Sequence, residues 1–211
     1  MIRQQQIIDW INNFTAVIAE NKDYLTELDA AIGDADHGIN MNRGFQKVKE
    51  KLPIVADKDI GTILKTVSMT LISTVGGASG PLYGTFFLKA SAVATHKNEL
   101  TSEELVKLLQ AGLEGVIQRG KAQLEDKTMI DALFPGIDVF KQSLANNNSV
   151  VEGLQKAVNA AEKGMKKTIP LIARKGRASY LGERSIGHQD PGATSSYLML
   201  KTLLEAVQKD N

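Results

Sequence analysis

Apolar residues recur at steps of three and four positions along most of the chain, the period that places them on one face of an α-helix. Near the N-terminus this step is followed by Ile7, Ile11, Phe14 and Ile18, and similar stripes continue to the last segment. No segment shows the apolar–polar alternation of a half-buried strand. The pattern predicts an all-α fold of eight or nine helices, over residues 2–20, 22–30, 39–52, 58–75, 81–96, 102–119, 128–145, 149–168 and 192–209.

Polar residues at several expected helix starts support these boundaries. Thr101-Ser-Glu-Glu104 fits a capping box, and Asp57 is expected to cap the helix that contains Ile60. The run Asn146-Asn-Asn-Ser149 predicts a turn before a new helix. Because no linker, repeat or low-complexity tract separates the helices, residues 1–211 are predicted to form a single domain.

One segment, residues 174–192, departs from the helical pattern. It contains four glycines and one proline, and it has no sustained apolar stripe. Long loops without regular structure in a compact domain are usually functional or disordered. Tyr180, Leu181 and Ile186 stand among its charged residues, which argues against simple disorder. We interpret the segment as an ordered lid or binding loop.

The composition narrows the classes of partner. Twenty-five basic and 24 acidic residues give a formal net charge of +1, so the chain has no overall field that attracts nucleic acid or an acidic membrane. No apolar run approaches the ~20 residues that span a bilayer, and the N-terminus lacks an apolar signal-peptide core. The absence of cysteine excludes disulfides, thiolate nucleophiles and cysteine-type metal sites. We expect a cytoplasmic protein that binds neither nucleic acid nor membrane.

A short acidic cluster offers the clearest chemistry in the chain. Asp29, Asp34 and Asp36 lie within eight residues, with Gly33 and Gly38 among and after them. Carboxylates this close repel one another, and hard oxygen ligands of this kind are what Mg²⁺ or Ca²⁺ requires. An isolated Asp-x-Asp is more often a solvated loop. Here the glycines permit the irregular backbone by which the carboxylates could converge, so we interpret the cluster as a metal site.

The residues that follow the cluster leave several roles open. An EF-hand loop counted from Asp34 would place Ile39 where glycine is needed and Phe45 where glutamate is needed, so that interpretation fails. His37 could ligate a metal, contact phosphate or orient a carboxylate through a hydrogen bond. Asn40 could bind phosphate, and helix capping would explain it equally well.

A glycine-rich segment, Gly76-Gly-Ala-Ser-Gly-Pro-Leu-Tyr-Gly84, joins two predicted helices. The second helix is expected to open near Pro81, since proline suits the first helical position. Glycine would let an anion approach the free N–H groups of the first helical turn, where the helix dipole is favourable. A phosphate site and a tight turn capped by Ser79 or Gly80 are about equally consistent with this segment.

Further candidates lie in the second half of the chain. The segment 115–122 has P-loop spacing, but Ala122 stands where Ser or Thr must bind Mg²⁺, so it is not a P-loop. Gly120 could let a ligand approach the backbone, or it could simply end a helix. The predicted loop contributes Arg174, Lys175, Arg177 and Arg184, and guanidinium groups suit phosphate recognition. Together with the acidic cluster and the glycine-rich segment, this basic loop predicts a site for a magnesium-bound nucleotide.

Four long segments together resemble the nucleotide-binding L domain of dihydroxyacetone kinases, and they occur in the family's order along the whole chain. They are Gly33-Asp-Ala-Asp-His-Gly-Ile-Asn-Met-Asn42, the glycine-rich segment 76–84, Arg119-Gly-Lys-Ala122 with Asp126-Lys-Thr-Met129, and residues 175–194. The resemblance implies an antiparallel helical barrel that holds ADP or ATP at one end through two Mg²⁺ ions. It implies metal ligation by Asp29, Asp34 and Asp36. It implies nucleotide contacts from His37, Gly38, Ile39, Asn40, Ala78, Ser79, Gly120, Met129, Arg177, Asp190, Pro191 and Gly192. Arg177 is the expected catalytic residue, stabilising charge on the transferring phosphoryl group.

The length of the chain bears on which branch of this family it resembles. With no room for a substrate-binding domain, it is similar to the free-standing L subunit of phosphoenolpyruvate-dependent systems. That resemblance implies a bound ADP coenzyme that is rephosphorylated in place by a phosphohistidine-carrying M subunit of the sugar phosphotransferase type. It implies a K subunit that holds dihydroxyacetone. Three alternatives remain: an ATP-dependent component that exchanges nucleotide freely, a nucleotide-state sensor for a transcription regulator and, less favoured, a metal-dependent phosphohydrolase.

Overall fold

The computed structural model describes residues 1–209 and confirms the predicted all-α architecture. The α-helices are α1 (Gln4–Glu20), α2 (Lys22–Ile32), α3 (His37–Lys51), α4 (Ile60–Thr74), α5 (Ser79–Val93), α6 (Ser102–Gly120), α7 (Ile130–Ala145), α8 (Val150–Lys167) and α9 (Pro191–Gln208). Two 3₁₀ helices, η1 (Leu52–Val55) and η2 (Arg177–Ser185), and two short strands, β1 (Ile2–Arg3) and β2 (Glu99–Leu100), complete the described chain. No helix among residues 1–209 combines the length and apolar character needed to cross a membrane.

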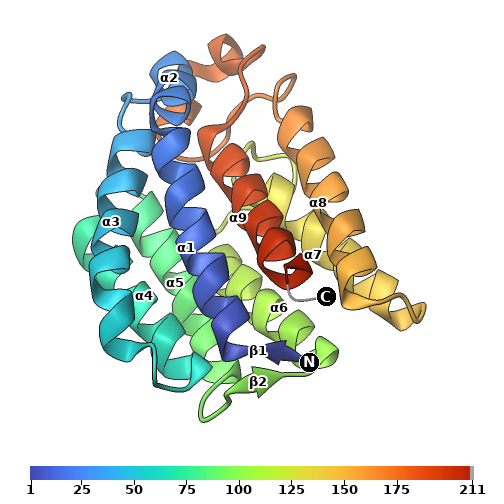
Figure 1. Ribbon diagram of the computed structural model, residues 1–211. Coiled ribbons are helices and arrows are strands. Elements are labelled where there is room, and N and C mark those ends of the chain that lie inside the picture. Colours follow the sequence, from blue (N-terminus) through green and yellow to red (C-terminus); the bar gives the residue numbers. More distant parts are fainter. Residues whose placement is uncertain (210–211) are drawn as a thin grey trace.

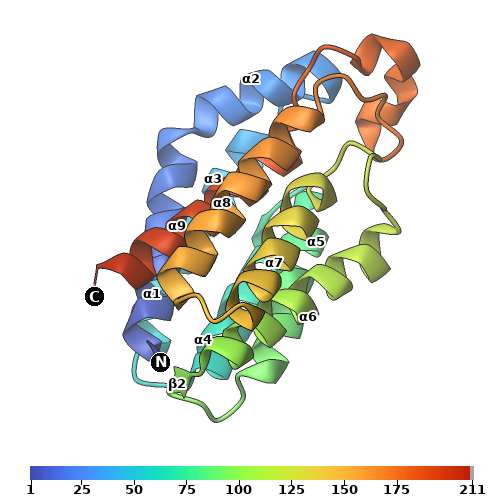
Figure 2. The ribbon, with the colours of Figure 1, turned by 90° about the vertical axis from the view of Figure 1, so that its right-hand side faces the viewer.

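The helices close into a barrel. Each helix packs against the next in the order α1, α3, α4, α5, α6, α7 and α9, and α9 packs against α1 to close the ring. Helix α8 packs against α7 and α9, and α2 packs against α3. Figure 1 shows that the barrel has two distinct ends, with α2 and the orange segment after α8 at the top and the two strands at the bottom. Figure 2 shows the same division from the side.

Large apolar side chains fill the interior and fix the helices relative to one another. Phe14 of α1 meets the ring of Phe45 of α3 edge-on, with centroids 4.7 Å apart. Trp10 is fully buried, and its indole N–H donates to the carbonyl of Met199 at 2.9 Å, which ties α1 to α9. Burial of such side chains is the main stabilising contribution to the fold. The polar ends of the barrel are thereby held on a rigid frame.

Several predicted boundaries require correction. Helix α1 begins at Gln4 because Ile2 and Arg3 pair with Leu100 and Glu99 in an antiparallel ribbon. Two residues per strand are too few to produce an alternating pattern, so this ribbon could not be predicted from apolar periodicity. Helix α5 begins at Ser79, which makes Pro81 its third residue and not its first.

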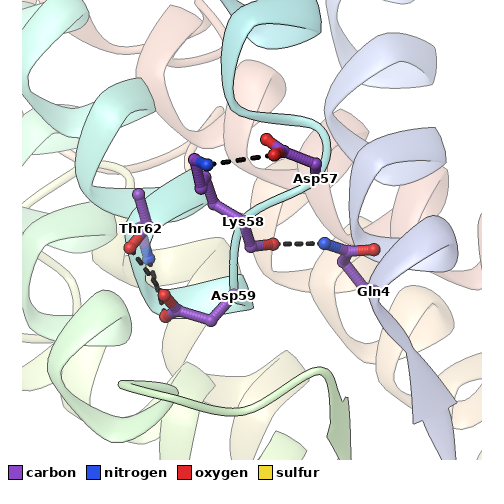
Figure 3. A network of polar contacts seen from close by, with 5 residues as sticks. All are labelled: Gln4, Asp57, Lys58, Asp59 and Thr62. Carbon is purple, nitrogen blue, oxygen red and sulfur yellow. Dashed lines mark hydrogen bonds and ion pairs between the residues drawn. The ribbon is translucent and has the colours of Figure 1, made fainter.

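The cap of α4 was also wrongly predicted. Asp59, and not Asp57, precedes the helix, and its carboxylate accepts the N–H of Thr62 at 3.0 Å. Asp57 forms an exposed ion pair with Lys58, whose backbone carbonyl accepts a hydrogen bond from Gln4 (Figure 3). By contrast, the capping box predicted at Thr101 and the new helix predicted after Ser149 are both present.

Candidate functional site

A cavity of about 470 Å³ opens at the end of the barrel opposite the strands. Its walls come from the C-terminal end of α2, the first residues of α3, α5 and α9, the end of α6, the turn before α7 and the start of η2. Of the predicted site residues, the cavity is lined by Asp29, Asp34, Asp36, His37, Ala78, Ser79, Gly120, Met129, Arg177, Asp190, Pro191 and Gly192. Segments spread over more than 160 residues of sequence therefore meet at one place.

The three aspartates converge because of the turn between α2 and α3. One carboxylate oxygen from each of Asp29, Asp34 and Asp36 lies within 4.8 Å of the others. Asp29, in the last turns of α2, uses its Oδ2 to accept the backbone N–H groups of Asp36 at 2.8 Å and His37 at 3.1 Å. A Cβ atom on Gly33 would lie 2.1 Å from Asp29 Oδ1, so only glycine permits this close approach. The turn thus aims three acidic side chains at one point.

The charges of this cluster are only partly balanced by the protein. Burial raises the pKa of Asp36 above its usual value, the charges of Asp34 and Asp29 add to the rise, and Asn40 and Arg177 oppose it. Arg177 Nε lies 2.9 Å from Asp34 Oδ2, in an ion pair whose side chains are 72% and 34% exposed. An exposed pair of this kind is weak and easily exchanged. Hard oxygen donors at this spacing fit Mg²⁺, which would neutralise the repulsion.

His37 is held inside the protein by two serines. Its Nδ1 lies 2.9 Å from the Ser79 hydroxyl and its Nε2 lies 2.9 Å from the Ser195 hydroxyl. Burial lowers the pKa of His37 to about 4, so the ring is neutral at physiological pH. Of the roles that the sequence left open, the structure shows a hydrogen-bonding one, to hydroxyls and not to a carboxylate.

A buried polar network continues from this histidine beneath the cavity. The Tyr83 hydroxyl lies 2.7 Å from the Ser195 hydroxyl and 3.1 Å from that of Ser196, and burial raises the pKa of Tyr83 to about 12. Neither Ser195 nor Ser196 was among the site residues predicted from the sequence. Their only signal was the run of small hydroxyl residues 194–196 at the start of an otherwise apolar helix.

The glycine-rich turn presents a helix N-terminus to the cavity. Neither Ser79 nor Gly80 caps α5. The position before the helix is Ala78, and no side chain among residues 1–209 caps the first N–H groups. Gly77 has φ of +64° and open space where a side chain would be, so the backbone is accessible there. An uncapped helix start beside open space favours the anion-site interpretation over that of a turn closed by its own cap.

Three predicted contact residues lie apart from the cavity lining. A Cβ atom on Gly38 would meet the Lys22 carbonyl at 2.0 Å, so this glycine serves the packing of α3 on α2. Ile39 is 49% exposed. Asn40 is buried and accepts a hydrogen bond from Arg43 at 2.7 Å, inside α3 and not as its cap. Contacts from these three residues to a nucleotide remain predictions.

The opposite wall comes from the second half of the chain. Gly120 is the last residue of α6, and the left-handed residue that ends this helix is Lys121 with φ of +50°, not glycine. Met129 directly precedes α7. Asp190 caps α9 by accepting the Ala193 N–H at 2.7 Å, and burial raises its pKa to about 7.

Several further residues complete the wall. Lys127, Thr128 and Gly176 line the cavity, although no site role was assigned to them from the sequence, and Lys175 of the predicted basic loop lines it as well. Arg174 and Arg184, predicted to belong to one basic cluster with Arg177, lie outside this lining. The loop interpretation of residues 174–192 is refined, because η2 occupies much of the segment.

Comparisons with known proteins give the family to which the chain is similar. The family model of the DAK2 domain matches residues 31–205. The chain is 52% identical over 208 residues to the "PEP-dependent dihydroxyacetone kinase, ADP-binding subunit DhaL" of Escherichia coli (strain K12), covering 99% of both chains. It is 45% identical over 207 residues to the "PTS-dependent dihydroxyacetone kinase, ADP-binding subunit DhaL" of Lactococcus lactis, covering 98% of this chain and 100% of the relative.

Among solved structures, the chain is similar to the dihydroxyacetone kinase of C. freundii. The complex of that kinase with AMP-PNP and Mg²⁺ superposes with a TM-score of 0.68 at 27% identity, over 94% of this chain and 33% of the kinase. The native form gives a TM-score of 0.73 at 26% identity, over 94% and 34%. This chain therefore spans about a third of the length of that kinase.

Proposed function

The chain belongs to the DAK2 domain family and is a subunit of the dihydroxyacetone kinase type, and from this premise we propose how its residues serve phosphoryl transfer. In the proposal, ADP is a tightly held coenzyme that a phosphohistidine-carrying subunit rephosphorylates in place. The γ-phosphoryl group then passes to dihydroxyacetone on a separate K subunit. The observation that carries the proposal is the convergence of three carboxylates beside an uncapped helix start in one cavity.

Each group in the cavity has a proposed role that follows from its charge and hydrogen-bonding capacity. Asp29, Asp34 and Asp36 would hold Mg²⁺, which when bound supplies positive charge to the phosphates. The first N–H groups of α5, reached over Gly77, would bind phosphate oxygens. Arg177 would stabilise the charge that develops during transfer, because a mobile guanidinium can leave Asp34 for a phosphoryl group. Positioning and charge neutralisation suffice for this chemistry, so no protein nucleophile is needed.

The buried wall would hold the rest of the nucleotide. Met129 offers an apolar surface for the nucleoside, and the turn Asp190-Pro191-Gly192 closes the same side of the cavity. The network of His37, Ser79 and Ser195 would keep the first residues of α3, α5 and α9 at fixed spacing. A neutral His37 with both ring nitrogens hydrogen-bonded is poorly suited to activate water, which disfavours the phosphohydrolase alternative.

We further propose that the site holds two Mg²⁺ ions, that the chain acts with K and M subunits, and that it is located in the cytoplasm. A transcription regulator that reads the nucleotide state would be a further partner of the same site. Each of these parts rests on the resemblance to the subunits of phosphoenolpyruvate-dependent kinases.

The first test is to dialyse the purified protein extensively, denature it, and quantify released nucleotide and Mg²⁺. Near-stoichiometric ADP with metal supports the coenzyme proposal. An empty protein that binds ATP reversibly would favour the freely exchanging alternative, and one without nucleotide affinity would refute both.

The companion test is Asp34→Ala, which should abolish binding of Mg²⁺ and ADP together, a loss of more than about 100-fold in nucleotide affinity. Calorimetric titration of ADP with and without Mg²⁺ measures both. Asp23→Ala is the matched control, because Asp23 lies on α2 with a 93% exposed side chain outside the cavity. Full nucleotide occupancy in Asp34→Ala would overturn the ligand assignment.

A further inference from the structure

Lys127 is a cationic side chain that no role described so far requires. It lies in the turn between α6 and α7 and is 1% exposed. Its Nζ donates to the backbone carbonyl of Ser185 at 2.6 Å, of Leu171 at 3.1 Å and, at a longer distance, of Ile169 at 3.5 Å. An ammonium group has three donors and no acceptor, so three carbonyls use its full capacity.

The turn that presents Lys127 is itself firmly held. Asp131 accepts the backbone N–H groups of Glu125 at 2.6 Å and Thr128 at 2.7 Å, and Asp126 accepts that of Gln123 at 3.0 Å. Glu125 and Lys127 have φ of +70° and +62°, a region that L residues enter only when their surroundings fix them. The two buried carboxylates therefore make this turn a rigid support.

The partner of this support is the segment 169–187, which joins α8 to the residues before α9. One edge of the segment carries Gly176 and Arg177 into the cavity, where Arg177 reaches Asp34. Its outer face is open to solvent, and Tyr180 is 87% exposed. Hydrogen bonds within the segment hold its own shape, among them the Gly187 N–H to the Ile169 carbonyl at 2.8 Å and the Ser185 hydroxyl to the Gly182 carbonyl at 2.6 Å.

Two cross-connections hold the segment to the turn between α6 and α7. One is the set of three carbonyls bound by Lys127, and the other is the Arg174 N–H, which donates to the Asp126 carbonyl at 3.0 Å. Loss of the lysine would leave the carbonyls of Leu171 and Ser185 without this donor, and an unpaired buried carbonyl is costly. The segment would then open more often.

We propose that Lys127 is a positioning residue: by binding the carbonyls of the segment 169–187, it holds Arg177 over the cavity and sets how slowly a bound nucleotide leaves. This inference rests on the proposed function, since it gives a structural reason for a coenzyme that is retained through turnover. Opening of such a segment is commonly the step that limits ligand release.

The test compares Lys127→Met with the wild-type chain in two measurements. Lys127→Met keeps the length of the side chain but removes the charge and the donors. Hydrogen exchange on the nucleotide-free protein should become faster within residues 169–187 and stay unchanged in α4 and α5. Release of ADP carrying an N-methylanthraniloyl label, chased with excess ADP and Mg²⁺, should become about tenfold faster.

Two further variants make the test specific. Lys141→Met makes the same chemical change at an exposed position on α7 and should alter neither measurement. Ser185→Ala loosens the same segment without changing any charge, because the Ser185 hydroxyl also accepts the Ala173 N–H at 2.9 Å. It should reproduce the direction of both effects, and it serves if Lys127→Met does not fold.

The outcomes separate this inference from the proposed function. If the wild-type chain binds labelled ADP and release is unchanged in Lys127→Met or Ser185→Ala, the inference is overturned while the function stands. Exchange that rises equally in all helices would also overturn it, because that result indicates general destabilisation. If the wild-type chain binds no nucleotide, the proposed function fails and the inference on release fails with it.

Discussion

Two aspartates occupy the same position before a helix at opposite ends of the barrel, yet their surroundings differ. Asp59, before α4, accepts the Thr62 N–H at 3.0 Å, the Thr62 hydroxyl at 2.7 Å and the His96 N–H at 3.1 Å (Figure 3 shows the Thr62 contacts). These hydrogen bonds, that of the Thr62 hydroxyl first, hold its pKa below the usual value. Asp190, before α9, accepts the Ala193 N–H, and burial raises its pKa to about 7, with the charge of Asp131 adding to the rise.

The contrast between the two aspartates indicates at which end of the barrel a ligand site is expected. A carboxylate that accepts several hydrogen bonds from protein donors, as Asp59 does, needs no ligand, and its ionised form stabilises the fold. For Asp190, burial and acidic neighbours outweigh the Ala193 N–H and the charge of Lys127, so the carboxylate is only partly compensated, and such groups gather at sites that receive a ligand. Asp36 follows the second pattern at the same end of the barrel. The end with the strands therefore serves stability, whereas the end with the cavity gives up stability for binding.

The largest expected effect lies at the cavity end. Arg177→Ala should lower phosphoryl transfer to dihydroxyacetone about 10³-fold in the kinase reconstituted with its partner subunits, because the developing charge loses its guanidinium. Nucleotide affinity should change far less. The melting temperature of the free protein should not change, since the Arg177–Asp34 pair is largely exposed.

Arg184→Ala is the matched control for this prediction. Arg184 lies on the same 3₁₀ helix but is exposed and outside the cavity lining. Its removal should leave transfer at the wild-type rate. Equal losses in both variants would show that the segment contributes only its overall charge, and Arg177 would lose its assigned role.

A second prediction compares the two capping aspartates directly through pH. Because the folded-state pKa of Asp190 is raised to about 7, its contribution to stability is full below about pH 4 and is lost as pH rises through 7. Asp190→Asn keeps a capping oxygen but cannot ionise. Without Mg²⁺ or nucleotide, the free energy of unfolding of this variant should therefore rise relative to that of the wild-type chain between pH 4 and 8, by on the order of 3 kcal/mol. Urea denaturation in EDTA at several pH values measures the gap.

Asp59→Asn should show the opposite sign. The pKa of Asp59 is lowered by its donors, so its contribution is present above its ordinary value of 3.8 and is lost as pH falls through the folded-state pKa. The wild-type chain should be the more stable of the two at neutral pH, and the gap should close in acid. Parallel pH profiles for the two aspartate variants would remove the distinction between the two ends.

Local signals were enough to predict most of the fold. The period of apolar residues located the helices, the capping box at Thr101 lies within four consecutive residues, and the turn 146–149 marked the start of a new helix. The choice between Asp57 and Asp59 was not local, because Asp59 is selected partly by the His96 N–H from another part of the chain. The strands are set by a pairing between residues about a hundred positions apart.

The candidate site was predictable where its chemistry is concentrated in sequence. The aspartates and the glycine-rich turn each lie in one short segment, Gly120 and Arg177 stood out by residue type and spacing, and the resemblance added Met129. The supporting contacts were not predictable, because His37 meets Ser195 across 158 residues and Lys127 meets Ser185 across 58. Lysine and serine are common surface residues, and only the folded chain shows that these two are buried.

The smallest expected effect lies at the end with the strands. Asp59→Ala removes the cap of α4 and the acceptor for the His96 N–H, and it should cost about 1–2 kcal/mol of unfolding free energy. Nucleotide affinity and transfer should stay at wild-type values, since Asp59 lies at the other end of the barrel from the cavity.

Asp57→Ala, two residues earlier and exposed, is the control and should unfold like the wild-type chain. Urea denaturation and ADP titration of the same samples decide the matter: equal destabilisation by both variants would mean that Asp59 is not the cap. A loss of ADP affinity in Asp59→Ala would mean that the two ends of the barrel are coupled, so that stability at one could not be separated from binding at the other.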